Sequence, residues 1–282
     1  MSHHDISPLT RVVARVDRLR EGREVHPSLI STGFPSIDRA LGGGIRRGDL
    51  IVAGGDDGVG TSALVMAMAL RIAPPTLVLT SEMPAERVYE RALAMSARVS
   101  LDAMRLGVIE DAERVRLAAA AVMLRNRSLI VDTLGHGGLD AVEIAANAIP
   151  APAVIIVDGL ESLLRRDQAF VQPRDEALAA AVLALKRLAL THDAAIVCLA
   201  HLPNLDRQRH DRRPRLGDFG VCGAIGTHAD VVFGLYREEL YDADLGVTGA
   251  TELRLLKNRD GPLAYIDLFF YPKWVRFEDV LE

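Results

Sequence analysis

Cysteine is scarce in this chain, since only Cys198 and Cys222 occur among its 282 residues. Two cysteines are too few for the disulfide framework that stabilises small secreted domains, so they favour a reducing compartment such as the cytoplasm. Long apolar runs are also missing, because none approaches the roughly 18 to 20 residues that a membrane-spanning helix needs. The first residues, Met-Ser-His-His-Asp, lack the basic-then-apolar order of a signal peptide. We therefore expect a soluble, cytoplasmic protein with no membrane partner.

An excess of basic residues is absent as well. The chain has 33 Lys and Arg against 38 Asp and Glu, which gives a formal net charge of -5. This balance excludes a globally basic nucleic-acid-binding protein, although it is compatible with a local basic channel inside an assembly. The length of 282 residues and the hydrophobic fraction of 49% are sufficient for one large α/β domain, alone or with an appendage.

Near the N-terminus, within residues 8–22, apolar residues form a single stripe. Their spacing of three and four predicts a short amphipathic helix that is stopped by Gly22. The stripe consists of Leu9, Val12, Val13, Val16 and Leu19. Two interpretations are open: the stripe packs on the chain's own domain, or it docks on a neighbouring subunit.

From about Ser31 onward, short apolar runs alternate with helical stretches. The runs are bounded by turn or charge signals, as expected for strands buried on both faces, and they predict strands at 49–54, 76–80, 129–132, 153–157, 194–199 and 230–235. Between most of them we predict helices, notably at 62–72, 84–97, 139–148 and 174–191. Strand patterns return at 251–278 around a turn at Asp260-Gly261-Pro262. The order predicts an α/β fold, with a mostly parallel sheet sandwiched by helices and a C-terminal β-hairpin.

The strand predicted at 49–54 leads into a glycine-rich loop, and a helix follows. The loop residues are Gly55, Asp56, Asp57, Gly58, Val59, Gly60, Thr61 and Ser62. Strand, glycine-rich loop and helix form the arrangement that wraps phosphates, because backbone N–H groups converge there and the helix N-terminus adds positive potential. The spacing fits G-x-x-x-x-G-K-[ST], except that Thr61 stands at the lysine position. Ser62 keeps the hydroxyl that normally holds Mg²⁺.

The missing lysine weakens the prediction of catalysis. In related loops this lysine neutralises charge on the β- and γ-phosphates, and loss of one such group commonly lowers a rate by about 10² to 10³-fold. Asp57 adds a negative charge to the same loop. Arg46 and Arg47 cannot substitute within one subunit, because the strand that follows them places them roughly 20 Å away. An ordinary glycine-rich turn that binds no nucleotide is the alternative interpretation.

Six stretches of the chain resemble, in order and spacing, the motifs of one helicase family. They are STGFPSIDRALGGG at 31–44, TSEMPAERVYERA at 80–92, VIIVDGLESL at 154–163, HADVVFGLYREELY at 228–241, KNRDGP at 257–262 and WVRFED at 274–279. On these motifs the chain resembles the RecA-like motor domain of the DnaB family of hexameric replicative helicases. The segment GGGIRRGDLIVAGGDDGVG is also similar to the RadA branch of the same superfamily. The resemblance implies a RecA-like P-loop NTPase core.

The resemblance also gives the N-terminal helix a role. Residues 8–22 resemble the linker helix that DnaB subunits dock on their neighbours, so we expect 1–26 to be a docking helix and 27–282 to be the ATPase domain. We expect no counterpart of the family's N-terminal collar domain. The family further implies a homo-oligomer, most simply a ring of six, that binds ATP or ADP with Mg²⁺ between subunits.

Several site residues follow from the same resemblance. Glu82 resembles the base that orients the attacking water, and Asp158 resembles the Walker B carboxylate that holds Mg²⁺ together with Ser62. His201 occupies the place of the family's glutamine sensor. Lys257 and Arg259 resemble the pair that a subunit inserts into its neighbour's nucleotide site. Structural alternatives are a carboxylate at a helix start for Glu82, a semi-buried histidine for His201, and a solvated turn for the basic pair.

Contacts to single-stranded DNA would come from basic and backbone groups on loops that line a pore. Five arginines on the loop at 203–216 are candidates, partly offset by two aspartates: Arg207, Arg209, Arg212, Arg213 and Arg215, with Asp206 and Asp211. Residues around Arg165, Arg166 and Arg174 are a candidate second loop, and a solvated charged loop is the alternative. The family has an Arg-Glu pair before Ser-Gly, whereas this chain has Gly220-Val221-Cys222-Gly223. Gly223 is therefore retained as a candidate, and the Arg-Glu pair is lost.

These observations lead to two main hypotheses. The first is a DnaB-like ring protein of DNA replication or repair, derived from an ATP-driven 5′-to-3′ helicase and slow or inactive in hydrolysis. The second is a non-hydrolysing scaffold or regulatory homologue that assembles with a full-length helicase or another replication or repair partner. An unrelated enzyme that uses the loop for another phosphate ligand is a third interpretation.

Overall fold

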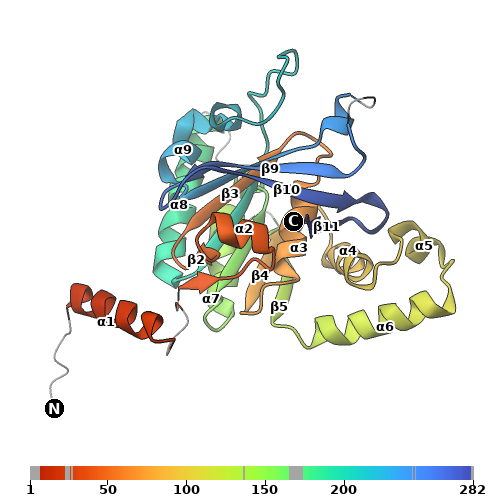
Figure 1. The fold of residues 1–282 in the computed structure, drawn as a ribbon, viewed down its shortest axis with the longest axis horizontal. Coiled ribbons are helices and arrows are strands. Elements are labelled where there is room, and N and C mark those ends of the chain that lie inside the picture. Colours follow the sequence, from red (N-terminus) through yellow and green to blue (C-terminus); the bar gives the residue numbers. More distant parts are fainter. Residues whose placement is uncertain are drawn as a thin grey trace.

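The structure is a computed structural model that describes residues 7–22, 26, 28–135, 137–164, 174–242, 244 and 246–280. In these residues one large sheet of nine strands has the order β11-β10-β9-β8-β3-β7-β6-β4-β5, with helices on both faces (Figure 1). A second, two-stranded sheet pairs β1 (Leu29–Ile30) with β2 (Ile45–Arg46). The predicted α/β class with a mostly parallel sheet is confirmed.

All six predicted strands of the parallel region are present, each within one residue of its predicted ends. They are β3 (Leu50–Gly55), β4 (Thr76–Thr80), β5 (Leu129–Thr133), β6 (Val154–Asp158), β7 (Ala195–Ala200) and β8 (Val231–Tyr236). Every residue of β3, β7 and β8 is buried, which explains their continuous apolar sequences. The glycine-rich loop at 55–62, called the phosphate loop below, follows β3. Because β3 lies between β7 and β8, this loop is at the middle of the sheet.

Two apolar clusters cover the two faces of the sheet. Side chains of β3 alternate between them, with Ile51 and Ala53 in one cluster and Leu50 and Val52 in the other. The first cluster includes residues of α2 (Pro35–Ala40), α3 (Thr61–Ala69) and α4 (Ala85–Ala97). The second includes residues of α7 (Gly138–Ala148), α8 (Arg174–His192) and α9 (Ala224–His228). This layering fixes α3, which begins at the phosphate loop, against the sheet.

An antiparallel extension completes the sheet at the C-terminal end. It consists of β9 (Ala250–Asn258), β10 (Ala264–Tyr271) and β11 (Arg276–Asp279), and β9 also pairs with β8. The predicted hairpin and its turn at Asp260-Gly261-Pro262 are confirmed. Phe270 and Phe277 from this extension pack against each other beneath the phosphate loop, with ring centroids 4.7 Å apart and planes tilted by 36°.

Other helices lie outside the predicted pattern. They are α5 (Leu101–Leu106) and α6 (Asp111–Arg125), which extend away from the sheet in Figure 1. Short 3-10 turns occur at Leu160–Leu163, Leu216–Phe219, Val221–Gly223, Glu238–Leu240 and Pro272–Trp274. No helix in the described part of the chain combines the length and apolar composition that crossing a membrane requires.

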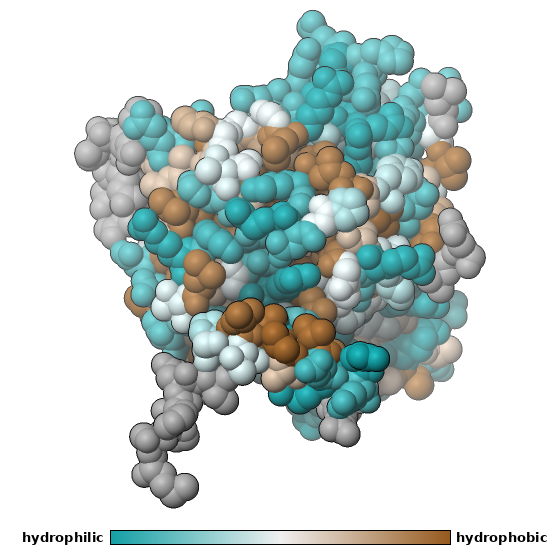
Figure 2. All heavy atoms as spheres, turned by 60° about the vertical axis from the view of Figure 1, so that its left-hand side comes forward, coloured by the Kyte–Doolittle hydropathy of each residue, from teal (hydrophilic) through white to brown (hydrophobic). Residues whose placement is uncertain are grey.

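The predicted N-terminal helix is present as α1 (Pro8–Arg20). It begins where the Ser7 side chain accepts a hydrogen bond from the Thr10 N–H at 3.2 Å, and it contains no buried residue. Four members of its apolar stripe are exposed: Leu9 (72%), Val12 (43%), Val13 (54%) and Val16 (55%). Figure 2 shows apolar side chains gathered in one band on this face of the molecule. The chain's own domain therefore leaves most of this stripe uncovered.

Candidate functional site

A cleft of about 360 Å³ opens at the C-terminal ends of the central parallel strands. The phosphate loop after β3 forms one wall, and residues that follow β4, β6 and β7 form the others: Glu82, Asp158, Gly159, Glu161 and His201. Ligands of parallel α/β sheets bind at this edge, because the loops that leave the strands converge there. The structure thus brings Glu82, Asp158 and His201 together with the phosphate loop, as the resemblance implies.

Backbone conformation gives the loop its phosphate-binding shape. Gly58 and Gly60 have φ of +78° and +102°, a region that other residues rarely adopt. A Cβ atom at Gly60 would also lie 3.1 Å from the Phe277 ring, so the close packing beneath the loop requires glycine. Thr61 and Ser62 are the first two residues of α3, where N–H groups without intrahelical partners point toward a bound anion.

Ser62 and Asp158 form the part of the cleft that fits a magnesium ion. The Ser62 hydroxyl donates a hydrogen bond of 3.3 Å to Asp158 Oδ1. Burial, with the nearby negative charge of Glu82, raises the pKa of Asp158 to about 6, while Ser62, Arg91 and His201 act in the opposite direction. A hydroxyl and a carboxylate side by side are the protein ligands of Mg²⁺ in phosphate-loop sites, and the ion takes its other ligands from phosphate and water. The described residues contain no group of three or more His, Cys, Asp or Glu arranged to hold a metal.

Glu82 and His201 are both accessible from the cleft. The Glu82 N–H donates to the Thr80 hydroxyl at 3.2 Å, whereas the N-cap of α4 is Pro84 and no side-chain hydrogen bond caps that helix. Glu82 thus lies two residues before the N-cap of α4, as the structural alternative of a carboxylate at a helix start expects, but its side chain makes no capping hydrogen bond. The His201 side chain is 60% exposed, and its Nδ1 lies 3.9 Å from Asp57 Oδ1, so the semi-buried alternative is not found.

Two charged residues of the cleft were not predicted from the sequence. Arg91 and Glu161 both line it, and the Glu161 carboxylate accepts a hydrogen bond of 3.3 Å from the His201 N–H. Arg91 lies between the buried Val88 and Met95 of α4, three and four residues away, so it is a charged residue on an otherwise apolar face. That break in the helical pattern is the signal that identifies Arg91. Its positive charge favours ionisation of Asp158.

Arg207, which the sequence placed among the DNA contacts, lies against the phosphate loop. Its Nη2 donates to Asp56 Oδ1 at 2.7 Å and lies 3.5 Å from Asp57 Oδ2. The Tyr241 hydroxyl donates to the other Asp56 oxygen at 3.0 Å. Burial acts to raise the pKa of Asp56, but the hydrogen bonds from Arg207, the Asp57 N–H and Tyr241 outweigh it and hold the pKa below its usual value.

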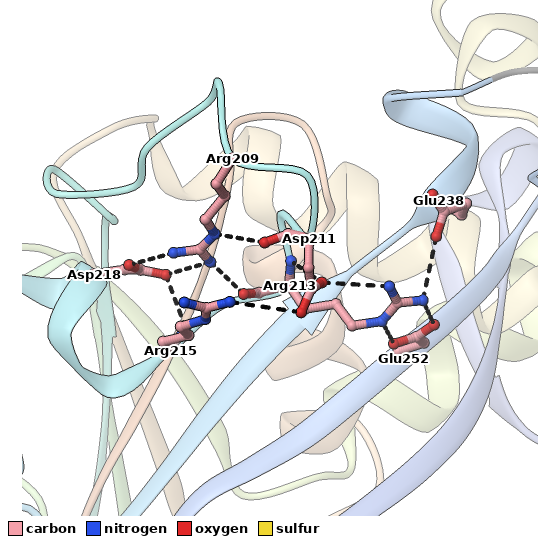
Figure 3. A network of polar contacts seen from close by, with 7 residues as sticks. All are labelled: Arg209, Asp211, Arg213, Arg215, Asp218, Glu238 and Glu252. Atoms are coloured by element: carbon pink, nitrogen blue, oxygen red, sulfur yellow. Dashed lines mark hydrogen bonds and ion pairs between the residues drawn. The ribbon is translucent and has the colours of Figure 1, made fainter.

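The other loop arginines have partners within the loop and the neighbouring sheet (Figure 3). Arg209 contacts the buried Asp218 at 2.7 Å, and Arg213 binds Glu252 through two hydrogen bonds of 2.6 Å. Arg215 is 61% exposed and lies 3.9 Å from Asp211. The Arg212 guanidinium lies 5.1 Å from the centre of the Tyr241 ring, and Gly223 is exposed. Of the second candidate loop, Arg165 and Arg166 lie outside the described residues, and Arg174 begins α8.

Lys257 and Arg259 lie at the other end of β8 from the phosphate loop. Lys257 pairs with Val232 near the start of that strand, whereas Gly55 of the phosphate loop pairs with Leu235 near its end. The Lys257 ammonium donates to the Gly226 carbonyl at 2.8 Å, and Arg259 Nε lies 2.6 Å from the buried Asp230 carboxylate. Neither basic residue lines the cleft of its own subunit.

Comparison with known proteins places the whole domain. Residues 30–279 match the family described as the DnaB-like helicase C terminal domain. The chain is 28% identical over 291 aligned residues to the replicative DNA helicase DnaB of Haemophilus influenzae, covering 98% of this chain and 61% of that protein. With DnaB of Geobacillus stearothermophilus the identity is 25% over 255 residues, or 88% of this chain and 56% of the relative. The chain thus spans about three-fifths of the length of these relatives.

Solved structures share the fold. A DnaB-like replicative helicase, solved in a study of its interactions with primase, superposes with a TM-score of 0.86 at 19% identity and covers 98% of this chain and 68% of that one. A second solved structure, which is an ATPase domain on its own, gives a TM-score of 0.87 at 19% identity, covering 98% of this chain and 100% of that domain. The sheet described above is therefore the RecA-like fold of these ATPase domains. The chain belongs to the family of DnaB-like helicase C-terminal domains.

Proposed function

We propose that this chain is a nucleotide-binding ring subunit of DNA replication or repair that binds ATP or ADP with Mg²⁺ and hydrolyses ATP slowly or not at all. One observation carries the proposal. The cleft keeps Ser62, Asp158 and Glu82 in the arrangement of a phosphate-loop ATPase, while Thr61 stands where the phosphate-binding lysine belongs. The family membership supports nucleotide binding, and the altered loop supports reduced turnover.

Each residue of the cleft has a defined task in this proposal. The N–H groups from Gly58 to Ser62 hold the phosphates, and Ser62 with Asp158 holds the ion, which neutralises phosphate charge when it is bound. Glu82 orients the attacking water, and His201 contacts the terminal phosphate. Thr61 supplies a neutral hydroxyl in place of an ammonium group, so the negative charge that develops in the transition state is stabilised less.

Assembly into a ring follows from two features of the surface. The apolar stripe of α1 is exposed in the single chain, and the basic hairpin residues lie away from the cleft of their own subunit. In a ring, α1 would cover its apolar stripe by docking on a neighbouring subunit, and Lys257 with Arg259 would reach that neighbour's nucleotide. We therefore propose a homo-oligomer, most simply a hexamer, in the cytoplasm.

Contact with single-stranded DNA would depend on few basic side chains. Arg209 and Arg213 are engaged by carboxylates, which leaves Arg212 and Arg215 as the main basic candidates, with Gly223 as a backbone contact. The family's Arg-Glu pair is replaced by Gly220 and Val221. We expect DNA binding to be weak and strongly salt-dependent.

A second candidate function is a non-hydrolysing scaffold or regulatory subunit that assembles with a full-length helicase. Two carboxylates in the phosphate loop, Asp56 and Asp57, favour it because they oppose an anionic ligand. Calorimetric titration with Mg²⁺-ATP, alongside steady-state ATPase assays with and without single-stranded DNA, separates the two. Binding with slow or no turnover supports the first candidate. No binding supports the scaffold, and turnover at normal helicase rates contradicts both.

A further inference from the structure

We propose that Arg207 takes the place of the missing lysine, so that a guanidinium from the loop at 203–216 contacts the terminal phosphates of the bound nucleotide. This inference rests on the proposed function, since it requires the cleft to bind a nucleotide. It assigns to phosphate binding a residue that the sequence placed among the DNA contacts.

The phosphate loop carries negative charge that a nearby cation must balance before the loop can bind phosphate. Asp56 and Asp57 bring two carboxylates to a loop whose ligand carries several further negative charges. Without a cation this arrangement repels phosphate, because like charges at a few ångströms disfavour each other strongly in a partly enclosed site. Arg207 bridges both carboxylates, at 2.7 Å from Asp56 and 3.5 Å from Asp57.

The guanidinium has donors to spare for a phosphate. All described contacts of Arg207 with the two carboxylates use Nη2, whereas arginine carries five N–H groups on three nitrogens. The side chain is 63% exposed, so a phosphate entering the loop can reach it without rearrangement of the core. A planar guanidinium also matches the geometry of phosphate oxygens through paired hydrogen bonds.

Asp56 acts as a positioning residue for this arginine. Its side chain is only 13% exposed, and it is fixed on its second oxygen by the Tyr241 hydroxyl at 3.0 Å. Tyr241 is held in turn by stacking on Tyr236, with ring centroids 5.2 Å apart and planes within 9°. An arginine anchored in this way loses less conformational entropy when it binds a phosphate.

The other described cations near the cleft have other partners, and this includes the buried Arg237, which donates to the Gly58 carbonyl at 3.5 Å but is paired with Glu239. Arg91 lies on the Asp158 side of the cleft, while Arg209 and Arg213 are bound to Asp218 and Glu252. Within the described residues, Arg207 is therefore the loop arginine whose ion pairs reach the phosphate loop itself. The alternative is that Arg207 only forms a structural ion pair with Asp56. The experiment must distinguish this ion pair from a direct contact with phosphate.

Fluorescent ATP, ADP and AMP analogues, titrated with Mg²⁺ onto the full chain, provide the test. Arg207→Gln should weaken ATP binding by about tenfold or more, ADP binding less, and AMP binding little, because the lost contact is to the terminal phosphates. Arg207→Lys should recover part of the ATP affinity. The matched control is Arg105→Gln, which removes a surface arginine 3.9 Å from Glu90 and should change no affinity more than twofold.

A variant that lacks the two loop carboxylates distinguishes direct contact of Arg207 with phosphate from neutralisation of these carboxylates by Arg207. In Asp56→Asn with Asp57→Asn, Arg207→Gln should still weaken ATP binding, although by less than in the wild type, because Asp56 no longer positions the arginine. An Arg207→Gln substitution that is silent in that background, or that weakens ATP, ADP and AMP equally, contradicts the inference. If the wild-type chain binds none of the three analogues, the proposed function itself is contradicted, whereas nucleotide binding that ignores Arg207 contradicts this inference alone.

Discussion

We propose that the charge at position 61 decides how tightly the phosphate loop holds its ligand. Thr61 and Ser62 begin α3 at the loop, so a lysine at 61 would start from the same backbone that carries this residue in related ATPases. The neighbouring Asp57 side chain is 80% exposed and opposes the phosphates. The loop thus keeps the backbone position of the lysine but lacks its positive charge.

Thr61→Lys should tighten Mg²⁺-ATP binding, because an ammonium group then faces the β- and γ-phosphates. We expect a gain of about 1.5 to 3 kcal/mol, the range of a charge-assisted hydrogen bond. Asp57→Pro should add to the gain by removing a negative charge. Calorimetric titration of the single and double variants measures both effects, and an unchanged dissociation constant for Thr61→Lys would contradict this assignment of the defect.

Asp158→Asn should stabilise the fold at pH 8 while abolishing the dependence of nucleotide binding on Mg²⁺. The pKa of Asp158 is raised from 3.8 to about 6, so its ionised form destabilises the folded state, by about 3 kcal/mol at 1.36 kcal/mol for each pKa unit. Because the folded-state pKa is the higher one, the stabilising effect of protonation is complete below about pH 4 and is lost as pH rises through about 6.

Urea denaturation of wild type and Asp158→Asn at pH 4.5 and pH 8 measures this difference. The variant should be the more stable protein at pH 8, and the two should converge at the lower pH. In the wild type, Mg²⁺ should bind more weakly as the pH falls from 7 to 5, because the carboxylate must be ionised to hold it. Equal stabilities at pH 8 would show that the carboxylate is not destabilised by burial.

Single residues were predictable from the sequence to the extent that a motif fixed their place on a strand end. Ser62, Glu82 and Asp158 are of this kind, because the order of strands and loops brings them to one edge of the sheet. Arg207 is not, because its partner lies 151 residues earlier in the chain and the loop between β7 and β8 has no periodicity from which its path follows. Its contact depends on tertiary structure alone.

Among the elements, the buried strands were the most predictable. Each is apolar on both faces because it lies between two helix layers, and a continuous apolar run is diagnostic of that environment. The short strands β1 and β2 and the helices α5 and α6 were not predicted. β1 and β2 have two residues each, and Val115 and Val122 of α6 are exposed at 69% and 56%, so burial imposes no clear pattern on these segments.

The turn at Val221–Gly223 shows why the family's Arg-Glu pair cannot simply be restored. Gly220 has φ of +61°, and a Cβ there would lie 3.2 Å from the side chains of Pro203 and Asn204. Val221 is 3% exposed within the core and also has a positive φ, of +53°. At the two positions where the family has Arg-Glu, the chain therefore has a tight turn in which Val221 is buried.

Gly220→Arg combined with Val221→Glu should therefore destabilise the fold, by about 3 kcal/mol or more, since it adds backbone strain and buries a carboxylate. Unwinding of a forked DNA should not return, even together with Thr61→Lys. Thermal denaturation and a fork-unwinding assay measure the two outcomes. Unwinding by the wild type, or by Thr61→Lys alone, would contradict the view that this segment limits DNA coupling.

For the whole molecule, the six family motifs predicted the fold and the family, because they span nearly the entire domain. How subunits assemble is less accessible from one chain. The stripe on α1 was visible as a pattern, and the structure adds that it is exposed. In the proposed ring, the surface that receives this stripe belongs to another copy, and docking there would stabilise the helix.

Deletion of residues 1–24 should convert the oligomer to a monomer, because it removes α1 and its stripe. Val12→Glu with Val16→Glu should have the same effect, whereas Arg20→Gln on the same helix should leave the assembly intact. Light scattering with size-exclusion chromatography measures the masses. A full-length chain that is already monomeric, or a deletion variant of unchanged oligomeric state, would contradict this assembly.

In the proposed function, the cleft retains Mg²⁺-ATP but turns it over slowly. A single-turnover experiment tests it most directly: the wild-type protein in excess is mixed with radiolabelled ATP and Mg²⁺, and the bound nucleotide is recovered on a filter and separated into ATP and ADP over time. Bound label should persist mainly as ATP, at least about 10²-fold longer than in an ATPase with the lysine. Conversion to ADP at the rate of an ordinary helicase, or no retention of label, would contradict it.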